Sequence, residues 1–229
     1  MELIFILYKP AVPGNIGAAA RAIKTMGFTR LRLIDPCNPL SEEARMMAHG
    51  SNDILENADV FKGFEEAVKD IDYLVGTTAK KRSPKVDYAT PAEIREIIYS
   101  KKENINKIAL LFGTEESGLP NEYLLECDIA STIPLKTHYP SLNLGQSVML
   151  YAYELSVLHT GVNKKENKIP EKSYVQLRER IKELLIMIDI KPESPLYPRI
   201  LERFSTVDSS DINLLHSITS RLGKIINKT

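Results

Sequence analysis

Residues 108–119 have the sequence IALLFGTEESGL, and this stretch decides the fold class. Its first part, Ile108–Phe112, is an uninterrupted apolar run, which is typical of a strand buried on both faces of a parallel sheet. Its second part supplies two glycines, Gly113 and Gly118, together with polar side chains. Ligands of open α/β sheets bind at the carboxyl ends of the strands. A loop of this kind directly after a buried strand therefore predicts one wall of a binding site.

Two other segments, far away in the chain, have the same character. Asn15–Arg21 follows the apolar run Leu3–Tyr8, and Ser141–Leu144 follows a strand expected over Ile129–Ile133. Each segment offers small residues, free backbone groups and one or two polar side chains. Because the carboxyl ends of parallel strands lie along one edge of a sheet, we predict that the three segments meet there in a single site.

Strands and helices alternate along the first two thirds of the chain, which predicts an α/β fold with a mostly parallel sheet flanked by helices. Asn15 is expected to cap a helix that Gly27 ends. The expected strands cover 3–8, 31–34, 73–77, 108–112 and 129–133, and the expected helices cover 15–26, 42–48, 64–70, 91–100, a segment after Pro120, and 143–159.

The last third of the chain differs from the rest. Residues 161–170 are polar and lack periodicity, which predicts a linker, and helical spacing of apolar residues follows over 171–189, 194–205 and 208–226. We therefore expect a domain over 1–160, a linker over 161–170 and a small helical C-terminal extension over 171–229. From residue 161 onward the net charge is +4, and before it −4. This modest excess is compatible with phosphate contacts and equally with an ordinary solvated helical surface.

Composition excludes several classes of protein. The 229 residues carry no net charge, so there is no bulk basic signal for nucleic acid, and no apolar run reaches the roughly 18 residues of a membrane span. Cys37 and Cys127 lack metal-type spacing and the four histidines are scattered, so we expect a reduced, cytoplasmic protein without a metal or a membrane partner. No G-x-G-x-x-G motif follows the first strand, which argues against a dinucleotide-binding fold.

Three motifs in correct order over residues 2–158 resemble the SPOUT superfamily of RNA methyltransferases, in its TrmH-like branch. They are Asn15-x-Gly17-x-x-x-Arg21 with Ala22–Phe28, then Leu110–Leu119, then Ile133-Pro134 through Ser141–Val148. Gly76–Arg82 and the basic helical tail make the chain similar to the TrmJ/LasT subgroup. This resemblance implies a sheet with a C-terminal trefoil knot, known as the SPOUT fold, an exception to the rule that chains are not threaded.

The resemblance also implies an activity. It is transfer of a methyl group from S-adenosyl-L-methionine to an RNA ribose 2′-hydroxyl, with tRNA as the substrate and anticodon-loop position 32 as the target. It implies a homodimer in which the two subunits share the RNA site. Three alternatives stay open, namely methylation of ribosomal RNA, a non-catalytic RNA-binding adaptor that retains the cofactor fold, and a base methylase of the same superfamily. The last would need an aspartate for which we find no match.

The resemblance assigns roles to individual residues. The cofactor-binding residues would be Thr77, Thr78, Ala79, Gly113, Gly118, Ile133, Ser141 and Leu142. The catalytic residues would be Arg21, Asn15, Glu115, Ser141 and Asn143, and the RNA-binding residues would be Lys80, Lys81 and Arg82.

Each assignment has an ordinary structural alternative. Asn15, Ser141 and Asn143 suit helix caps, and the glycines suit ordinary turns. Arg21 suits a solvated helix surface, and the basic run 80–82 suits an exposed loop. For Arg21 the sequence leaves two roles open. It either accepts the hydroxyl proton, or it positions a phosphate and stabilises the developing alkoxide.

Overall fold

The structure is a computed structural model, and it describes residues 1–79, 88–137, 141–159 and 174–226. Its internal contacts divide the chain into two compact units. The larger unit comprises Glu2–Arg95 and Lys107–Lys164, and the smaller comprises Met1, Glu96–Asn106 and Lys165–Thr229. The segment Glu96–Asn106 therefore clusters with the C-terminal helices, although it lies inside the domain expected over residues 1–160.

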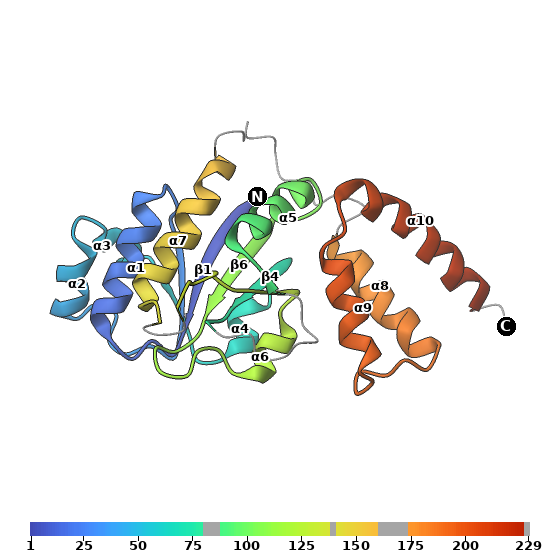
Figure 1. The fold of residues 1–229 in the computed structure, drawn as a ribbon, viewed down its shortest axis with the longest axis horizontal. Coiled ribbons are helices and arrows are strands. Elements are labelled where there is room, and N and C mark those ends of the chain that lie inside the picture. Colours follow the sequence, from blue (N-terminus) through green and yellow to red (C-terminus); the bar gives the residue numbers. More distant parts are fainter. Residues whose placement is uncertain (80–87, 138–140, 160–173, 227–229) are drawn as a thin grey trace. The chain divides into compact units, whose positions relative to one another are not determined.

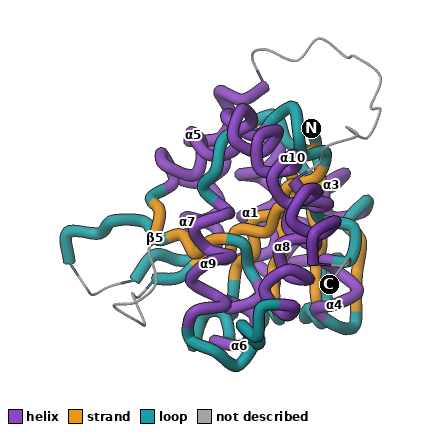
Figure 2. The backbone as a smooth tube through the Cα atoms, turned by 90° about the vertical axis from the view of Figure 1, so that its right-hand side faces the viewer, coloured by secondary structure: helices purple, strands orange, loops and turns teal. Residues whose placement is uncertain are grey.

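The larger unit is built on a parallel sheet (Figure 1; Figure 2). Within the described residues the sheet has seven strands in the order β3-β2-β1-β6-β4-β7-β5, and every pairing is parallel. The strands are β1 (Glu2–Tyr8), β2 (Arg30–Ile34), β3 (Asp59–Phe61), β4 (Tyr73–Thr77), β5 (Tyr88–Ala89), β6 (Lys107–Phe112) and β7 (Ile129–Ser131). The α/β fold with a parallel sheet is thus confirmed.

Helices cover both faces of this sheet because the central strands are apolar on both sides. On β1, Ile4 and Ile6 face a core shared with α4 and α6, whereas Phe5 points to the other face and packs edge-on against Phe28. On that second face α1 packs against α2, α3 and α7 (Figure 1). The helices of this unit are α1 (Pro13–Thr25), α2 (Glu42–Ala48), α3 (Asn52–Glu56), α4 (Phe64–Val68), α6 (Asn121–Glu126), α7 (Leu144–Ser156) and a 3₁₀ turn (Val157–His159).

The strand register brings four loops to one edge of the sheet. Leu7 pairs with Phe112 and Thr77 pairs with Ser131, so the loops after β1, β4, β6 and β7 begin side by side. One expectation was wrong: Asn15 does not cap α1. The helix begins at Pro13 with Val12 as its N-cap, because proline at the first helical position has the required φ and lacks only an N–H that would have no partner. The Asn15 side chain is thereby left for other contacts.

The smaller unit is helical. It contains α8 (Tyr174–Met187), α9 (Leu196–Ser205) and α10 (Ser209–Ile226), together with the end of α5 (Pro91–Lys101). Lys101 is completely buried in it, where its ammonium group donates to the Val207 carbonyl and lies near the Tyr174 ring. The backbone N–H of Tyr174 donates to the carbonyl of Asn104 at 3.2 Å. These contacts attach the C-terminal helices to the segment that follows α5.

Candidate active site

A pocket of about 450 Å³ opens at the carboxyl ends of β4, β6 and β7, beside the start of α7. Every residue that the resemblance names as a cofactor contact lines it: Thr77, Thr78, Ala79, Gly113, Gly118, Ile133, Ser141 and Leu142. That these residues contact a cofactor stays a prediction. Two of the three distant segments, the loop after β6 and the stretch around Ser141–Leu144, therefore line one cavity together with the end of β4, whereas no residue of Asn15–Arg21 lines it. Besides Glu115, the other described lining residues are Phe112, Thr114, Glu116, Ser117, Leu135, Leu144, Ser147 and Tyr151; all but Tyr151 lie within the predicted motifs, although the resemblance gave them no individual role.

The residues that line the pocket from α7 follow a recognisable sequence pattern. Leu144, Ser147 and Tyr151 recur at the three- and four-residue spacing of one helix face, so the face of α7 toward the pocket could have been predicted. Tyr151 is buried, donates from its hydroxyl to Ser131 Oγ at 2.7 Å, and packs edge-on against Phe112. Burial raises the pKa of this phenol above its ordinary value. Tyr151 therefore forms an uncharged wall.

The loop after β6 closes on itself as a tight hairpin. Thr114 and Gly118 exchange backbone hydrogen bonds of 3.1 and 3.0 Å, and Gly118 has a φ of +71°, in the left-handed region. A Cβ on Gly113 would lie 2.0 Å from the backbone nitrogen of Leu119, a separation that no side chain can tolerate. Both glycines are thus required by the hairpin itself, whatever else they contact.

Three of the predicted catalytic residues form one hydrogen-bonded chain next to the pocket. The Asn15 amide donates to Glu115 Oε1 at 2.9 Å, and the Asn143 amide donates to Asn15 Oδ1 at 2.7 Å. Glu115 also accepts from the backbone N–H groups of Ala11 and Val12. Residues from the first helix, the β6 loop and the last helix of the unit are therefore joined side chain to side chain.

Asn143 has a second role in this chain of contacts. It is the N-cap of α7, where its Oδ1 accepts from the Gly145 N–H at 2.8 Å and its own N–H donates to Gln146 Oε1 at 3.1 Å. The capping alternative and the proposed site role are thus compatible for Asn143. Ser141 lines the pocket and is not the cap of α7.

The Glu115 carboxylate sits in a setting that favours its charged form. Partial burial acts to raise its pKa, but hydrogen bonds from Asn15, Ala11 and Val12 outweigh this and leave the pKa below its ordinary value. The carboxylate receives the backbone donors at the start of α1, where negative charge is also favoured by the helix dipole. Glu115 therefore organises the start of α1 as well as the pocket wall.

Replacing Glu115 with glutamine should lower the free energy of unfolding at pH 7 by about 1–2 kcal/mol, because an amide group cannot accept at both positions. Since the folded pKa is lowered, the carboxylate's contribution is complete above the ordinary pKa of 4.5 and disappears as the pH falls through the folded value. Urea unfolding at pH 7 and pH 3 measures this. Glu116→Gln, at the exposed neighbouring carboxylate, is the control, and an undiminished difference at pH 3 would contradict the prediction.

Arg21 is not brought into the pocket of its own chain. It is exposed on α1, is absent from the pocket lining, and forms no hydrogen bond or ion pair with any residue that the structure describes. Gly17 of the same motif is a packing residue, since a Cβ there would lie 2.1 Å from the Ala44 carbonyl oxygen of α2. The first motif therefore combines a helix-packing glycine with a free guanidinium.

The remaining expectations concern residues and features that are not part of the pocket or of its hydrogen-bonded chain. Lys80, Lys81 and Arg82, predicted to bind RNA, lie outside the described residues, as does the linker expected over 161–170. Among the described residues no three His, Cys, Asp or Glu side chains are grouped so as to hold a metal ion. No helix in the described ranges is both long enough and apolar enough to cross a membrane.

Comparisons with known proteins agree with the geometry. Residues 2–153 match the SpoU rRNA Methylase family, and residues 171–226 match the C-terminal domain of the tRNA/rRNA methyltransferase LasT. An Escherichia coli protein named as an uncharacterized tRNA/rRNA methyltransferase LasT is 39% identical over 228 residues, covering 100% of both chains. The tRNA (cytidine-2′-O-)-methyltransferase TrmJ of Methanocaldococcus jannaschii is 34% identical over 184 residues, covering 79% of this chain and 76% of the relative.

A solved structure supports the same assignment. A probable methylase family protein from Haemophilus influenzae superposes with a TM-score of 0.67 at 30% sequence identity, covering 98% of this chain and 97% of the other. The similarity thus extends over both units and confirms the resemblance carried by the three motifs. The chain belongs to the SpoU methylase family, with a LasT-type C-terminal domain.

Proposed function

We propose that this protein is an S-adenosyl-L-methionine-dependent RNA methyltransferase of the cytoplasm that methylates a ribose 2′-hydroxyl of tRNA. The observation that carries the proposal is the hydrogen-bonded chain Glu115–Asn15–Asn143 at the mouth of the pocket. It joins the three motifs of the family into one site. A non-catalytic adaptor would have no need to keep these three side chains in register, and the TrmJ relative is named for this reaction.

The pocket fits the methyl donor of the family. Its volume of about 450 Å³ lies within the range of small-molecule sites, roughly 300–1,000 Å³. Its described lining includes two carboxylates, Glu115 and Glu116, and no cationic side chain, which suits a ligand with a positively charged sulfonium. Backbone groups of Gly113 and Ile133 and the hydroxyls of Thr77 and Ser141 would hold the donor. When bound, the donor supplies an electrophilic methyl group.

The chain's own residues must then present the ribose. Glu115 accepts from the Asn15 amide, and Asn15 in turn accepts from the Asn143 amide. The two asparagines are thereby held in one arrangement and form a fixed polar surface next to the pocket. A ribose hydroxyl becomes a good nucleophile only as it loses its proton. A guanidinium has five N–H donors and no acceptor, so Arg21 is unsuited to take that proton. We assign Arg21 to the phosphate or the developing alkoxide, with the proton passing to water or to an RNA phosphate.

A homodimer completes this assignment. Arg21 does not line the pocket of its own chain, and it lies one turn along α1 from Ala18, which packs against Gly145 at the start of α7. On α7 and the 3₁₀ turn after it, three apolar side chains at helical spacing face solvent, with exposed fractions of 41% for Leu150, 64% for Tyr153 and 53% for Val157. A second copy packed on this stripe would cover it and could place its own Arg21 at the neighbouring pocket.

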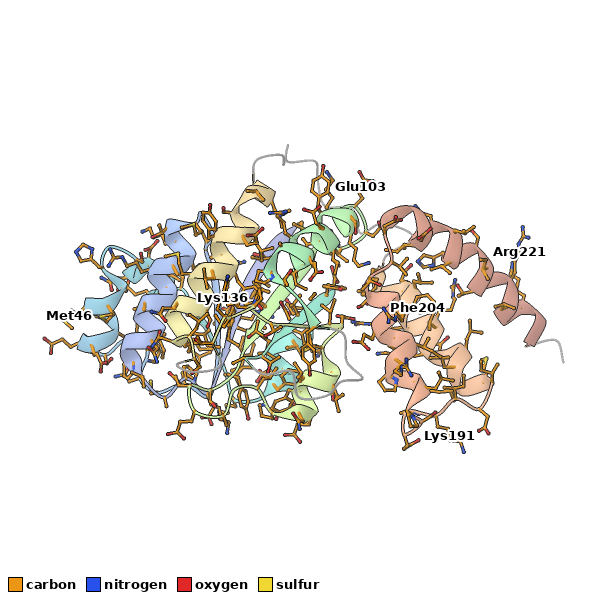
Figure 3. The ribbon with its side chains drawn as sticks, viewed as in Figure 1. Met46, Glu103, Lys136, Lys191, Phe204 and Arg221 are labelled. Atoms are coloured by element: carbon orange, nitrogen blue, oxygen red, sulfur yellow. The ribbon has the colours of Figure 1, made fainter. Side chains whose placement is uncertain are left out.

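The dimer predicts a specific loss. Tyr153→Glu combined with Leu150→Glu should convert the protein from dimer to monomer, because two carboxylates cannot be desolvated in an apolar interface. Light scattering coupled to size-exclusion chromatography measures the mass. Met46→Glu, at a residue on α2 that is 67% exposed (Figure 3), is the matched control and should remain dimeric. A monomeric wild-type protein would contradict the proposal.

The trefoil knot predicted from the resemblance is part of this proposal. Its support is the strand order: the chain passes from the edge strand β5 to the centre at β6, crosses β4 to reach β7, and then packs α7 against α1. Such a path takes the last segment across earlier loops.

The reaction itself is tested by incubating the full chain with labelled methyl donor and unfractionated tRNA. Methylated ribose resists alkaline hydrolysis, so mapping the resistant bonds identifies the nucleotide and checks position 32. Label found only in ribosomal RNA would show that ribosomal RNA, and not tRNA, is the substrate. Micromolar binding of S-adenosylhomocysteine without label in any RNA would favour an adaptor.

A further inference from the structure

The loop between β7 and α7 carries a lysine whose surroundings set it apart. Along this loop Ile133 and Leu135 line the pocket, whereas Pro134 and Lys136 do not. Pro134, Leu135 and Lys136 are all exposed. Lys136 therefore directly follows a residue of the pocket wall and is itself open to solvent.

The larger unit pairs most of its cations with carboxylates. Side chains in such ion pairs are Lys9, Lys24, Arg30, Arg32, Arg45, Arg95 and Lys107. Lys136 forms no ion pair with any described residue. Arg21, Lys62 and Lys69 also form none. Arg21 does not line the pocket, and Lys62 and Lys69 flank α4, which packs on the face of the sheet opposite α7. Among the described cations of this unit, Lys136 is thus the unpaired one that directly follows a pocket-lining residue.

The charge of the pocket indicates a role for Lys136. Glu115 and Glu116 line the pocket, and none of its described lining residues is a cation, so these residues by themselves repel a polyanion. RNA carries one negative charge per nucleotide, and its affinity for proteins comes largely from lysine and arginine contacts to phosphates. An RNA that offers its ribose to this pocket must bring phosphates to the rim, where Lys136 lies.

We infer that Lys136 binds a backbone phosphate of the substrate RNA and so holds the acceptor nucleotide at the mouth of the pocket. The inference rests on the proposed function. A lysine suits the role because its flexible stem follows a phosphate whose position changes as the nucleotide enters. Lys136 acts on RNA alone, since it lies outside the pocket that the methyl donor fills.

The test compares Lys136→Gln with Lys69→Gln, which removes an unpaired lysine from the opposite face. Affinity for unfractionated tRNA is measured at several salt concentrations, and affinity for S-adenosylhomocysteine is measured by calorimetry. Lys136→Gln should weaken tRNA binding by about three- to tenfold and reduce the slope of log affinity against log salt by about 0.7–0.9. Donor affinity should be unchanged, and Lys136→Arg should restore tRNA affinity.

The outcomes separate this inference from the proposed function. If the wild-type protein binds and methylates tRNA but Lys136→Gln behaves like Lys69→Gln, the inference is wrong and the proposed function stands. Loss of donor affinity in Lys136→Gln would assign the lysine to the donor and also overturn the inference. A wild-type protein that neither binds nor methylates RNA would remove the proposed function itself.

Discussion

Arg21→Ala is expected to slow methyl transfer to tRNA by about 10²- to 10⁴-fold, the range found for removal of one group that acts on the transition state. The guanidinium does not line the pocket and forms no hydrogen bond or ion pair with any described residue of its own subunit. Its removal therefore costs the fold no polar interaction among the described residues. The loss should therefore fall on turnover, and affinity for S-adenosylhomocysteine should stay within about twofold of wild type, since its pocket is intact.

Single-turnover kinetics with saturating donor measures the rate, and calorimetry measures donor binding. Arg45→Ala, at an exposed arginine on α2, is the control and should retain wild-type turnover. Near-normal turnover in Arg21→Ala would exclude both roles considered for the guanidinium, proton acceptor and phosphate or alkoxide partner.

Subunit mixing locates the arginine. Leu142→Glu places a carboxylate in the pocket lining and should block donor binding in its own subunit. If Arg21 serves the pocket of the partner, mixing this variant with Arg21→Ala gives heterodimers with one complete site, and activity returns. If Arg21 serves its own pocket, the mixture stays inactive.

Gly17→Ala and Gly223→Ala make the same change inside a helix and should shift stability in opposite directions. A Cβ on Gly17 would lie 2.1 Å from the Ala44 carbonyl oxygen and 2.9 Å from Met47 Cβ, so α1 and α2 must separate. Overpacking of this kind costs about 1–3 kcal/mol. A Cβ on Gly223 in α10 meets nothing within 4 Å, and alanine stabilises a helix relative to glycine by about 0.5–1 kcal/mol.

Thermal unfolding of the two variants and the wild type measures this contrast. The melting temperature should fall for Gly17→Ala and stay level or rise for Gly223→Ala. Because α1 carries Asn15, the first variant should also lose donor affinity as the helix shifts. A Gly17→Ala protein as stable as wild type would show that α1 and α2 do not pack backbone to backbone.

Much of the fold could be predicted from sequence because its central strands are strongly patterned. Tyr73–Thr77 and Glu42–Ala48 have the observed bounds of β4 and α2, and Ile108–Phe112 lies within β6. The missed elements α3, β3 and β5 are only two to five residues long. They are held by pairing with neighbours: β5 has two residues that pair with β7, and no local periodicity can mark so short a strand.

The site was predictable in its members and less so in its connections. The motifs named Asn15, Glu115 and Asn143, but the sequence suggested Asn15 as a cap. Only the structure shows Val12 in that place and the Asn143 amide bonded to Asn15. The orientation of Arg21 could not be predicted from the sequence either. It depends on how α1 packs against α2 and α7, and not on the position of Arg21 in the motif.

The hydrogen bond between Asn143 and Asn15 joins residues 128 positions apart in the sequence, and this separation has a consequence for the nascent chain. A ribosome delivers Asn15 and its helix long before it delivers Asn143. Until the second asparagine emerges, the Asn15 side chain lacks the amide donor that Asn143 supplies, and α7 lacks its N-cap. We therefore expect the chain to modify RNA only after α7 has been synthesised, and we expect truncated products that lack α7 to be inactive.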